Sequence, residues 1–362
     1  MKGRVSEAPP RVSRPSLTGR VVRDSLAVMR AWVPLWRPRH RWRSAAATLA
    51  LGAALLILAW TAPQPVKNLY LRLTSSVGAL AKLASLTPAS HGPPATVRLA
   101  RSTMPGGFLH LPPTFTSTDG SYDLVLHFHG NVGLVEESFA VAGIDAAVVI
   151  LNAGLGTGAY DQLYRAPAVI PAVLARVEED LVRRGIEHPR RRRVAVTAWS
   201  AGWGAVSAVL DNGVLGDSLD AIVLLDGLHS SYLRQKEIDT TRLAGLEAFA
   251  RRAMRDERLL TITHSEIETY TYPSTHETSD ALLGMLGLAR TPGGPRPELP
   301  ALSQFYGIPR DKLVALVPTS ECHAGSFHLR GYTGTTAEDH MMHLAYMASI
   351  ALPDLARRWN AR

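Results

Sequence analysis

The chain has 362 residues, 46% of them hydrophobic, with 39 Lys and Arg against 31 Asp and Glu. This length and apolar content allow a full hydrophobic core and exclude a disordered protein, and the single cysteine excludes an intramolecular disulfide framework. The net charge of +8 comes from one end: residues 1–43 hold 11 basic and 2 acidic residues, and the remainder holds 28 and 29. A nucleic-acid groove would place its basic residues on the folded domain, so we expect no nucleic-acid partner.

The N-terminal region is predicted to attach the chain to a membrane. After the basic tail of residues 1–43, residues 44–62 carry no charge, and these 19 residues are enough to span a bilayer as a helix. Pro63 and Pro65 then stop the helix. The positive charges are expected to hold the tail in the cytoplasm, which places the C-terminal domain on the exported side. Secretion after cleavage of 44–62 as a signal peptide is the alternative, although no clear small-x-small site follows it.

Residues 63–95 are predicted to be a linker. Its part from 66 to 86 repeats leucine and valine at a spacing compatible with an amphipathic helix. Pro88, Gly92, Pro93 and Pro94 then interrupt regular structure, so the globular domain is expected to occupy residues 96–362.

Within this domain, strand-like and helical patterns alternate. Helical spacing appears at 168–184, at 242–255 and from about 337 onward. Apolar strand patterns occupy 122–128, 146–152, 194–198, 219–225, 259–264 and 327–332. This alternation predicts an α/β fold with a mainly parallel sheet and helices on both of its faces.

The most informative segment is 193–204, where a buried strand pattern runs into Ser200. Small residues follow the serine, including Ala201, Gly202 and Gly204, and they allow the next helix to pack closely on the sheet. A serine on such a sharp turn projects its hydroxyl above the sheet edge. The backbone N–H of Ala201, at a helix N-terminus, is placed to stabilise an anionic intermediate. Ser200 is therefore the predicted nucleophile of a serine hydrolase.

This order of elements resembles the α/β-hydrolase superfamily over residues 96–362. The resemblance rests on Phe128-His129-Gly130-Asn131 after an early strand, Ala198-Trp199-Ser200-Ala201-Gly202 at the turn, and Asp339-His340 after the last strand. Ala198 stands where the G-x-S-x-G pattern has its first glycine. The tripeptide 129–131 also looks like the oxyanion turn of haloalkane dehalogenases, but those enzymes use an aspartate nucleophile. The resemblance implies a triad in the order serine, acid, histidine.

His340 is the predicted base, because the loop after the last strand pattern can bring it back to the serine. His343 is the alternative, and one of the two, His343 by preference, is expected to be a surface residue of the helix. Asp226 is the predicted acid, since it follows the strand 219–225 at the carboxyl edge of the sheet. Glu266 follows the next strand, at the more usual position in the superfamily, and Glu277 and Asp280 are further candidates.

The backbone N–H groups of Asn131 and Ala201 are predicted to form the oxyanion hole, because both follow strand ends at the same sheet edge. His129 is expected to order its own turn by hydrogen bonding. Neither it nor His127 is expected to be the base.

Two other motifs are set aside. Gly154, Gly156 and Ala159 match G-x-G-x-x-A, but prolines interrupt the following helix and no acidic residue ends the next strand, so no cofactor is expected. His340, His343, His323 and His328 lack a metal-binding spacing, so no metal is expected. The segments 229–240 and 270–274 are interpreted either as covers of the pocket or as ordinary surface loops.

These features predict a membrane-anchored serine hydrolase that cleaves a carboxylic ester through an acyl-enzyme. Amides and thioesters are alternative substrates, and an acyltransferase would use the same serine chemistry. The expected partner is a small-molecule or lipid-like ester. The alternative function is a hydrolase-like binding module that has lost catalysis and is tethered to the membrane. This hypothesis is supported by Ala198 in place of the first glycine of the motif and by the open choice between Asp226 and Glu266 as the acid.

Overall fold

The computed structural model describes residues 101–104, 106–113, 115–302 and 313–360. The predicted tail, membrane span and linker, and residue 96 at the predicted domain start, lie outside these ranges. Within them, no helix combines the length and the apolar character needed to cross a bilayer.

One sheet organises the described residues. Its strand order is β1-β2-β4-β3-β5-β6-β7-β10-β9-β8. The central strands β4, β3, β5, β6, β7 and β10 are parallel, and the pairs at both edges are antiparallel. The strands are β1 (Arg101–Met104), β2 (Gly107–His110), β3 (Ser121–Phe128), β4 (Ala147–Leu151), β5 (Arg190–Trp199), β6 (Leu219–Leu225), β7 (Leu259–His264), β8 (Thr291–Pro292), β9 (Pro318–Ala324) and β10 (Phe327–Tyr332).

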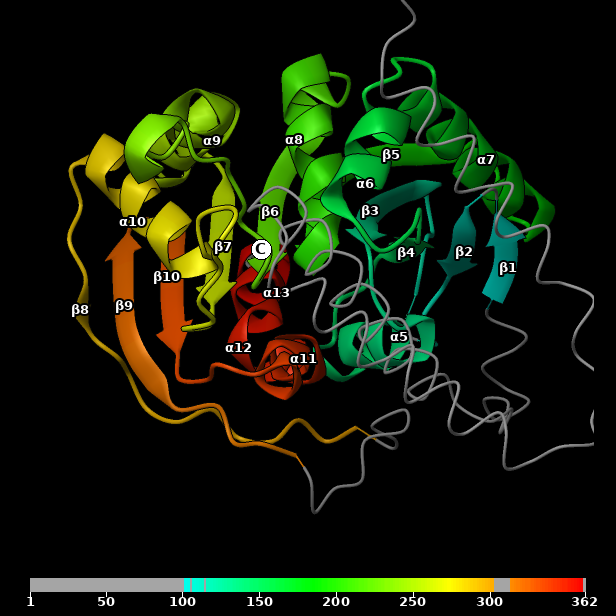
Figure 1. Cartoon of the computed structure of the whole chain (residues 1–362). Helices are drawn as coiled ribbons and strands as arrows, with labels where there is room; N and C mark the ends of the chain where they lie inside the picture. The colour runs from blue at the N-terminus through cyan, green and yellow to red at the C-terminus, as the bar shows by residue number, and fades with distance from the viewer. Residues whose placement is uncertain (1–100, 105, 114, 303–312, 361–362) are drawn as a thin grey trace, which may run out of the picture. The chain divides into compact units, whose positions relative to one another are not determined.

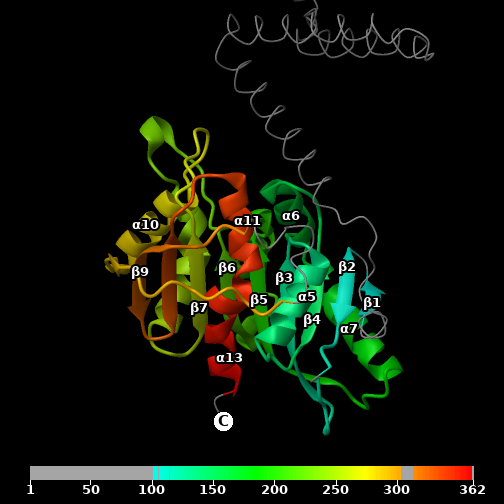
Figure 2. The same ribbon diagram turned by 90° about the horizontal axis from the view of Figure 1, so that it is seen from below.

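Helices cover both faces of this sheet, as the alternation of patterns predicted (Figure 1). One face carries α6 (Thr157–Tyr164), α7 (Val169–Arg183), α8 (Trp203–Asn212), α9 (Ala244–Ala253) and α10 (Thr275–Leu286). The other carries α5 (Val132–Val141), α11 (Ala337–Ala345), α12 (Met347–Ile350) and α13 (Leu352–Asn360). Figure 2 shows α5, α11 and α13 in front of the central strands. The predicted α/β class is confirmed.

Successive side chains of each central strand enter two different cores. In β5, Val194, Val196 and Ala198 pack with the α6–α10 layer, whereas Ala195 and Trp199 pack with the α5 and α11–α13 layer. Alternate residues of a strand point to opposite faces, and both faces here are covered. This explains why β4 and β6 read as nearly continuous apolar runs.

The six predicted strands match β3, β4, β5, β6, β7 and β10, but the edge strands were not predicted. β1, β2 and β8 have four residues or fewer, and β9 carries several polar side chains that are only partly buried. Because an edge strand buries less surface than a central one, it leaves a weaker apolar pattern in the sequence.

Candidate active site

The turn after β5 holds Ser200 in a strained conformation. Ser200 has a φ of 52° and opens the short 3-10 helix η2 (Ser200–Gly202), which runs directly into α8. Non-glycine residues rarely adopt such a φ, at a cost on the order of 1–2 kcal/mol. The predicted sharp turn between strand and helix is therefore present in the structure.

Glycines allow this turn to pack tightly against its neighbours. A Cβ on Gly202 would lie 2.2 Å from the carbonyl oxygen of Phe128 in β3, and one on Gly227 would lie 2.8 Å from the backbone nitrogen of Ser200. Ala198 is fully buried, and its Cβ would lie 3.0 Å from a Cβ on Gly202. Alanine at the first position of the motif is accommodated as long as residue 202 has no side chain.

Asp226 and His340 are joined by a hydrogen bond. Asp226 follows β6 and is 1% exposed, and its Oδ2 lies 2.7 Å from Nδ1 of His340 in α11. Its Oδ1 accepts hydrogen bonds from the backbone N–H of Ser265 at 2.9 Å and from the Thr275 hydroxyl at 2.6 Å. Burial alone would raise the pKa of Asp226, but His343, the His340 hydrogen bond and the Thr275 hydroxyl hold it well below its ordinary value. Asp226 is thus a carboxylate that orients the His340 ring.

The other candidate acids have different partners. The Glu266 carboxylate contacts Nδ1 of His276 and accepts from the Thr319 hydroxyl at 3.2 Å. Glu277 closes the N-terminal capping box of α10 with Ser274. Asp280 accepts from Nε of Arg290 at 2.7 Å and lies 3.3 Å from Nε2 of His276. The hydrogen bonds of these three carboxylates go to residues other than His340.

His343 differs from His340 in its exposure. Its side chain is fully buried, its Nδ1 lies 2.9 Å from the Thr263 hydroxyl, and burial lowers its pKa to about 4. The His340 side chain is 22% exposed and can meet a substrate. From the sequence, His343 was the residue of the pair expected on the helix surface. That expectation is wrong, because α11 turns His343 into the core.

The Ser200 hydroxyl is not among the hydrogen-bond partners of His340 in the described residues. In unliganded enzymes such catalytic hydrogen bonds are often long, and they close when a substrate binds.

The turn between β3 and α5 places Asn131 at the N-terminus of a helix. The Asn131 side chain caps α5 by accepting from the Leu134 backbone N–H at 3.1 Å. The side chain of Asn152 holds the turn by bonding both the N–H and the carbonyl of Gly130, at 3.0 and 3.1 Å. Asn131 and Ala201 each follow a central strand, β3 and β5, which are direct neighbours in the sheet. Both backbone amides therefore lie at the carboxyl edge.

His127 and His129 make hydrogen bonds that order this turn. His127 is fully buried, with Nδ1 2.8 Å from the Thr197 hydroxyl and Nε2 3.0 Å from the carbonyl oxygen of His129. His129 has a φ of 69°, and its Nδ1 lies 2.9 Å from the Tyr160 hydroxyl. Burial lowers the pKa of both imidazoles, to about 3 and about 4. Both are neutral at pH 7 and engaged with their surroundings.

One cluster has the residue types of a metal site: ligand atoms of His264, Glu266 and His276 lie within 4.8 Å of one another. However, Nη1 of Arg290 lies 2.7 Å from Nε2 of His264, and Nδ1 of His264 lies 3.0 Å from the Ser265 carbonyl oxygen. A guanidinium is always a donor, so the lone pair of Nε2 is already used and Nδ1 carries the proton. With these two hydrogen bonds, His264 has no free lone pair for a metal ion.

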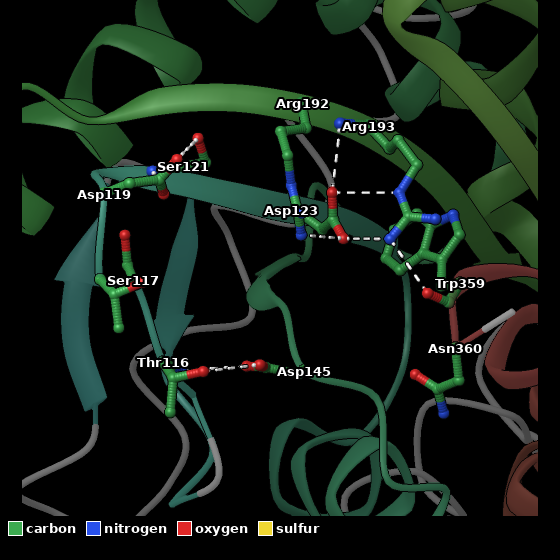
Figure 3. A pocket seen from close by; sticks show the side chains of 11 residues that line it. Thr116, Ser117, Asp119, Ser121, Asp123, Asp145, Arg192, Arg193, Trp359 and Asn360 are labelled. Carbon is green, nitrogen blue, oxygen red and sulfur yellow. Dashed lines mark hydrogen bonds and ion pairs between the residues drawn. The ribbon is translucent and has the colours of Figure 1, made fainter. Parts of the chain in front are cut away.

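A hollow of about 770 Å³ lies at the opposite end of the sheet (Figure 3). Arg192 and Arg193, at the start of β5, both pair there with the buried carboxylate of Asp123, and the Arg193 guanidinium lies 5.1 Å from the ring centre of Trp359. A strand rises about 3.3 Å per residue, so Ser200 is roughly 23 Å from Arg193. The hollow is separate from the candidate site.

The segments 229–240 and 270–274 contact each other beside Asp226. The ring of His229 packs edge-on against Tyr272, with centres 5.9 Å apart, and the Tyr232 hydroxyl bonds Glu277 at 3.0 Å. Tyr270, by contrast, is 85% exposed. Their role as pocket covers stays a prediction.

Buried histidines make the stability of the domain dependent on pH. Burial is the main cause that lowers the pKa from 6.5 to about 3 or 4 in His110, His127, His129, His229, His264 and His343. As pH falls below 6.5 the unfolded chain takes up protons that the folded domain does not. We therefore expect the free energy of unfolding to fall by up to about 1.4 kcal/mol per pH unit for each histidine, down to about pH 4.

Urea unfolding at about pH 7.5 and about pH 5.5 measures this loss. Neither ring nitrogen of His110 has a hydrogen-bond partner among the described residues, so His110→Leu is the matched variant and should show a shallower slope. Equal stability at both pH values would contradict the expectation.

Several residues of the site were not predicted from the sequence. Ser265, directly after β7, and Thr275, in α10, donate hydrogen bonds to Asp226, and the Trp199 ring packs against His340. The pattern Ser274-x-x-Glu277 is a capping-box signal that marks the start of α10 and would have placed Thr275 in its first turn. Nothing in the sequence pattern brings Thr275 to Asp226, because that contact depends on the sheet order.

No protein-family model and no curated protein matches the chain. Among solved structures it is similar to LpqC, a poly(3-hydroxybutyrate) depolymerase from Bordetella parapertussis, with 14% identity, a TM-score of 0.35, and 67% of this chain and 82% of that chain covered. An acetyl xylan esterase from Aspergillus awamori matches with 12% identity and a TM-score of 0.35, over 67% and 97% of the two chains. The siderophore hydrolase EstB from Aspergillus nidulans matches with 13% identity and a TM-score of 0.36, over 74% and 96%.

The topology of the described residues matches the order of elements that the resemblance to the α/β-hydrolase superfamily implies. Parallel central strands have helices on both faces, and the sharp turn with Ser200 joins β5 to α8. Asp226 and His340 follow later strands, β6 and β10, in the order of the chain. The described domain therefore has the mainly parallel sheet, the helices on both faces and the order of elements that the resemblance to the superfamily implies.

Proposed function

We propose that this chain is a serine hydrolase that cleaves carboxylic esters, with Ser200 as nucleophile, His340 as base and Asp226 as the acid that orients the base. The observation that carries the proposal is the 2.7 Å contact between the buried Asp226 carboxylate and Nδ1 of the partly exposed His340. With Nδ1 donating to Asp226, Nε2 of His340 keeps a lone pair that can accept a proton.

In the proposed reaction, His340 takes the Ser200 proton as Oγ attacks the ester carbonyl carbon. The oxyanion that forms is stabilised by the backbone N–H groups of Asn131 and Ala201. Collapse breaks the bond to the leaving alcohol, which receives the proton from His340, and leaves an acyl group on Ser200. Water, activated by His340, then releases the carboxylic acid and restores the serine. The buried Asp226 carboxylate stabilises the imidazolium in both steps.

The proposed setting is a membrane surface. The basic tail and the apolar segment 44–62 support a single N-terminal anchor with the hydrolase domain on the exported side. The substrate class is a small or lipid-like ester. A reporter fused after Arg362 tests the orientation, because a cytoplasmic signal would contradict the anchor.

Labelling with a fluorophosphonate tests the nucleophile directly. We expect the full chain in detergent to be labelled covalently and Ser200→Ala to remain unlabelled, because the probe reacts with an activated serine. Ser207→Ala, in α8, is the matched control and should label like the unmodified chain. An unlabelled unmodified chain would favour the tethered binding module, and labelling that persists in Ser200→Ala would place the nucleophile elsewhere.

A further inference from the structure

Trp199 links the strand that carries the proposed nucleophile to the proposed base. It is the last residue of β5, directly before Ser200, and is 5% exposed. Its ring is stacked on the His340 imidazole, with centres 4.7 Å apart and planes inclined by 29°. Its Nε1–H also donates to the backbone carbonyl oxygen of His340 at 3.1 Å. One side chain thus holds both the ring and the backbone of His340.

A second imidazole supports the indole. The His129 ring is stacked on Trp199 with centres 5.1 Å apart and planes inclined by only 5°. Burial raises the pKa of Tyr160 to about 12, so its hydroxyl keeps its proton and can donate to Nδ1 of His129 at 2.9 Å. The indole is therefore held by a neutral ring that is itself anchored, and its position is not free to relax.

We propose that Trp199 is the positioning residue of the base: it fixes the orientation of His340 and favours the protonated ring that forms during the reaction. This inference rests on the proposed function. A cation over an indole face is attracted by the ring quadrupole, whereas the neutral imidazole gains less from the same contact. Because His340 must become an imidazolium when it takes the serine proton, stacking on Trp199 lowers the energy of that step.

Asp226 and three histidines surround His340. Asp226 is the ionised group in contact with it, through Nδ1. His129, His229 and His343 also lie close enough to interact with His340 electrostatically, and burial lowers the pKa of each to about 4. Above about pH 5 these three imidazoles are neutral.

Two substitutions separate the stacking contact from the hydrogen bond. Trp199→Leu removes both, so we expect the acid limb of the kcat/KM profile to move to lower pH by about half a unit to one unit. Its kcat should fall on the order of a hundredfold, because His340 is no longer held in place. Trp199→Phe keeps a smaller aromatic face but loses the N–H, so its acid limb should stay closer to that of the unmodified chain, with about a tenfold loss of kcat.

The same shift can be measured without turnover. In a Ser200→Ala background, NMR of isotope-labelled histidine gives the pKa of His340, assigned by the signal lost in His340→Asn. We expect Trp199→Leu to lower this pKa and Trp199→Phe to leave it nearly unchanged. Trp359 is a matched control, since it also stacks on a cation and donates from Nε1, but at the far end of the sheet. Trp359→Leu should leave the pKa of His340 unchanged.

The outcomes separate this inference from the proposed function. If the unmodified chain is not labelled by fluorophosphonate, the function fails, yet the NMR titration still tests the contact. If labelling succeeds but Trp199→Leu leaves the pKa of His340 unchanged or raises it, the positioning role of Trp199 is overturned and the function stands. The positioning role of Trp199 would also be overturned if Trp199→Leu and Trp199→Phe lost kcat equally and neither variant shifted the acid limb of the kcat/KM profile.

Discussion

Replacement of His340 by alanine is expected to lower kcat for a p-nitrophenyl ester on the order of 10⁶-fold, the loss seen when a hydrolase triad loses its base. The alanine leaves no group to take the Ser200 proton, and a serine hydroxyl near neutral pH is a poor nucleophile. The 2.7 Å contact between Nδ1 of His340 and Asp226 is the structural basis of this prediction. Initial rates of ester hydrolysis by the full chain measure it.

His343→Gln is the matched control for this prediction. His343 lies one turn further along α11, is fully buried and bonds the Thr263 hydroxyl, so its replacement should cost stability. It should nevertheless leave kcat within about tenfold of the unmodified chain, because the buried imidazole does not meet the substrate. A folded His343→Gln protein without activity, beside an active His340→Ala protein, would reverse the assignment of the base.

Replacement of Asp226 by asparagine is expected to lower kcat on the order of 10⁴-fold. The amide keeps the size of the carboxylate, but its NH₂ group cannot accept a hydrogen bond from the Nδ1–H of His340. The imidazole would then favour the wrong tautomer and present a donor to Ser200. Loss of the negative charge also removes the partner of the imidazolium. The expected loss should appear in kcat with little change in KM, because Asp226 does not contact the substrate.

Glu266→Gln is the control for the acid. Glu266 occupies the position after β7 that is more usual in the superfamily, but its carboxylate contacts His276 and Thr319 instead of His340. We expect its replacement to change kcat by less than about tenfold. If Glu266→Gln abolished turnover while Asp226→Asn remained active, the acid would have been assigned to the wrong strand.

The central part of the fold could be read from periodicity alone. Six apolar runs correspond to β3, β4, β5, β6, β7 and β10, because most residues of these runs are buried and only β10 alternates buried with half-buried positions. The edge strands and the helices α5, α6 and α10 were not predicted; in the edge strands, exposed or polar residues weaken the pattern. The position of Ser200 could also be predicted, because the small residues after it are required by close backbone contacts that any sheet-to-helix turn of this kind must make.

The choice between competing residues depended on tertiary structure. By sequence, Asp226 and Glu266 are equivalent carboxylates after consecutive strands, and His340 and His343 are neighbours on one helix. The direction of α11 over the sheet turns His340 toward Asp226 and buries His343 against Thr263. Such choices depend on the angle and depth at which elements pack, and local sequence does not encode these directly.

The fold class, the serine turn and the apolar segment at 44–62 can be predicted from the residues alone, because they depend on residue size, periodicity and charge along the chain. Which acid meets which histidine depends on how the elements pack. The same packing brings Trp199 against His340, 141 residues later in the chain, and against His129, 70 residues earlier. Hydrogen bonds and ring contacts act over a few ångströms in space, and the sheet brings together positions that lie far apart along the chain.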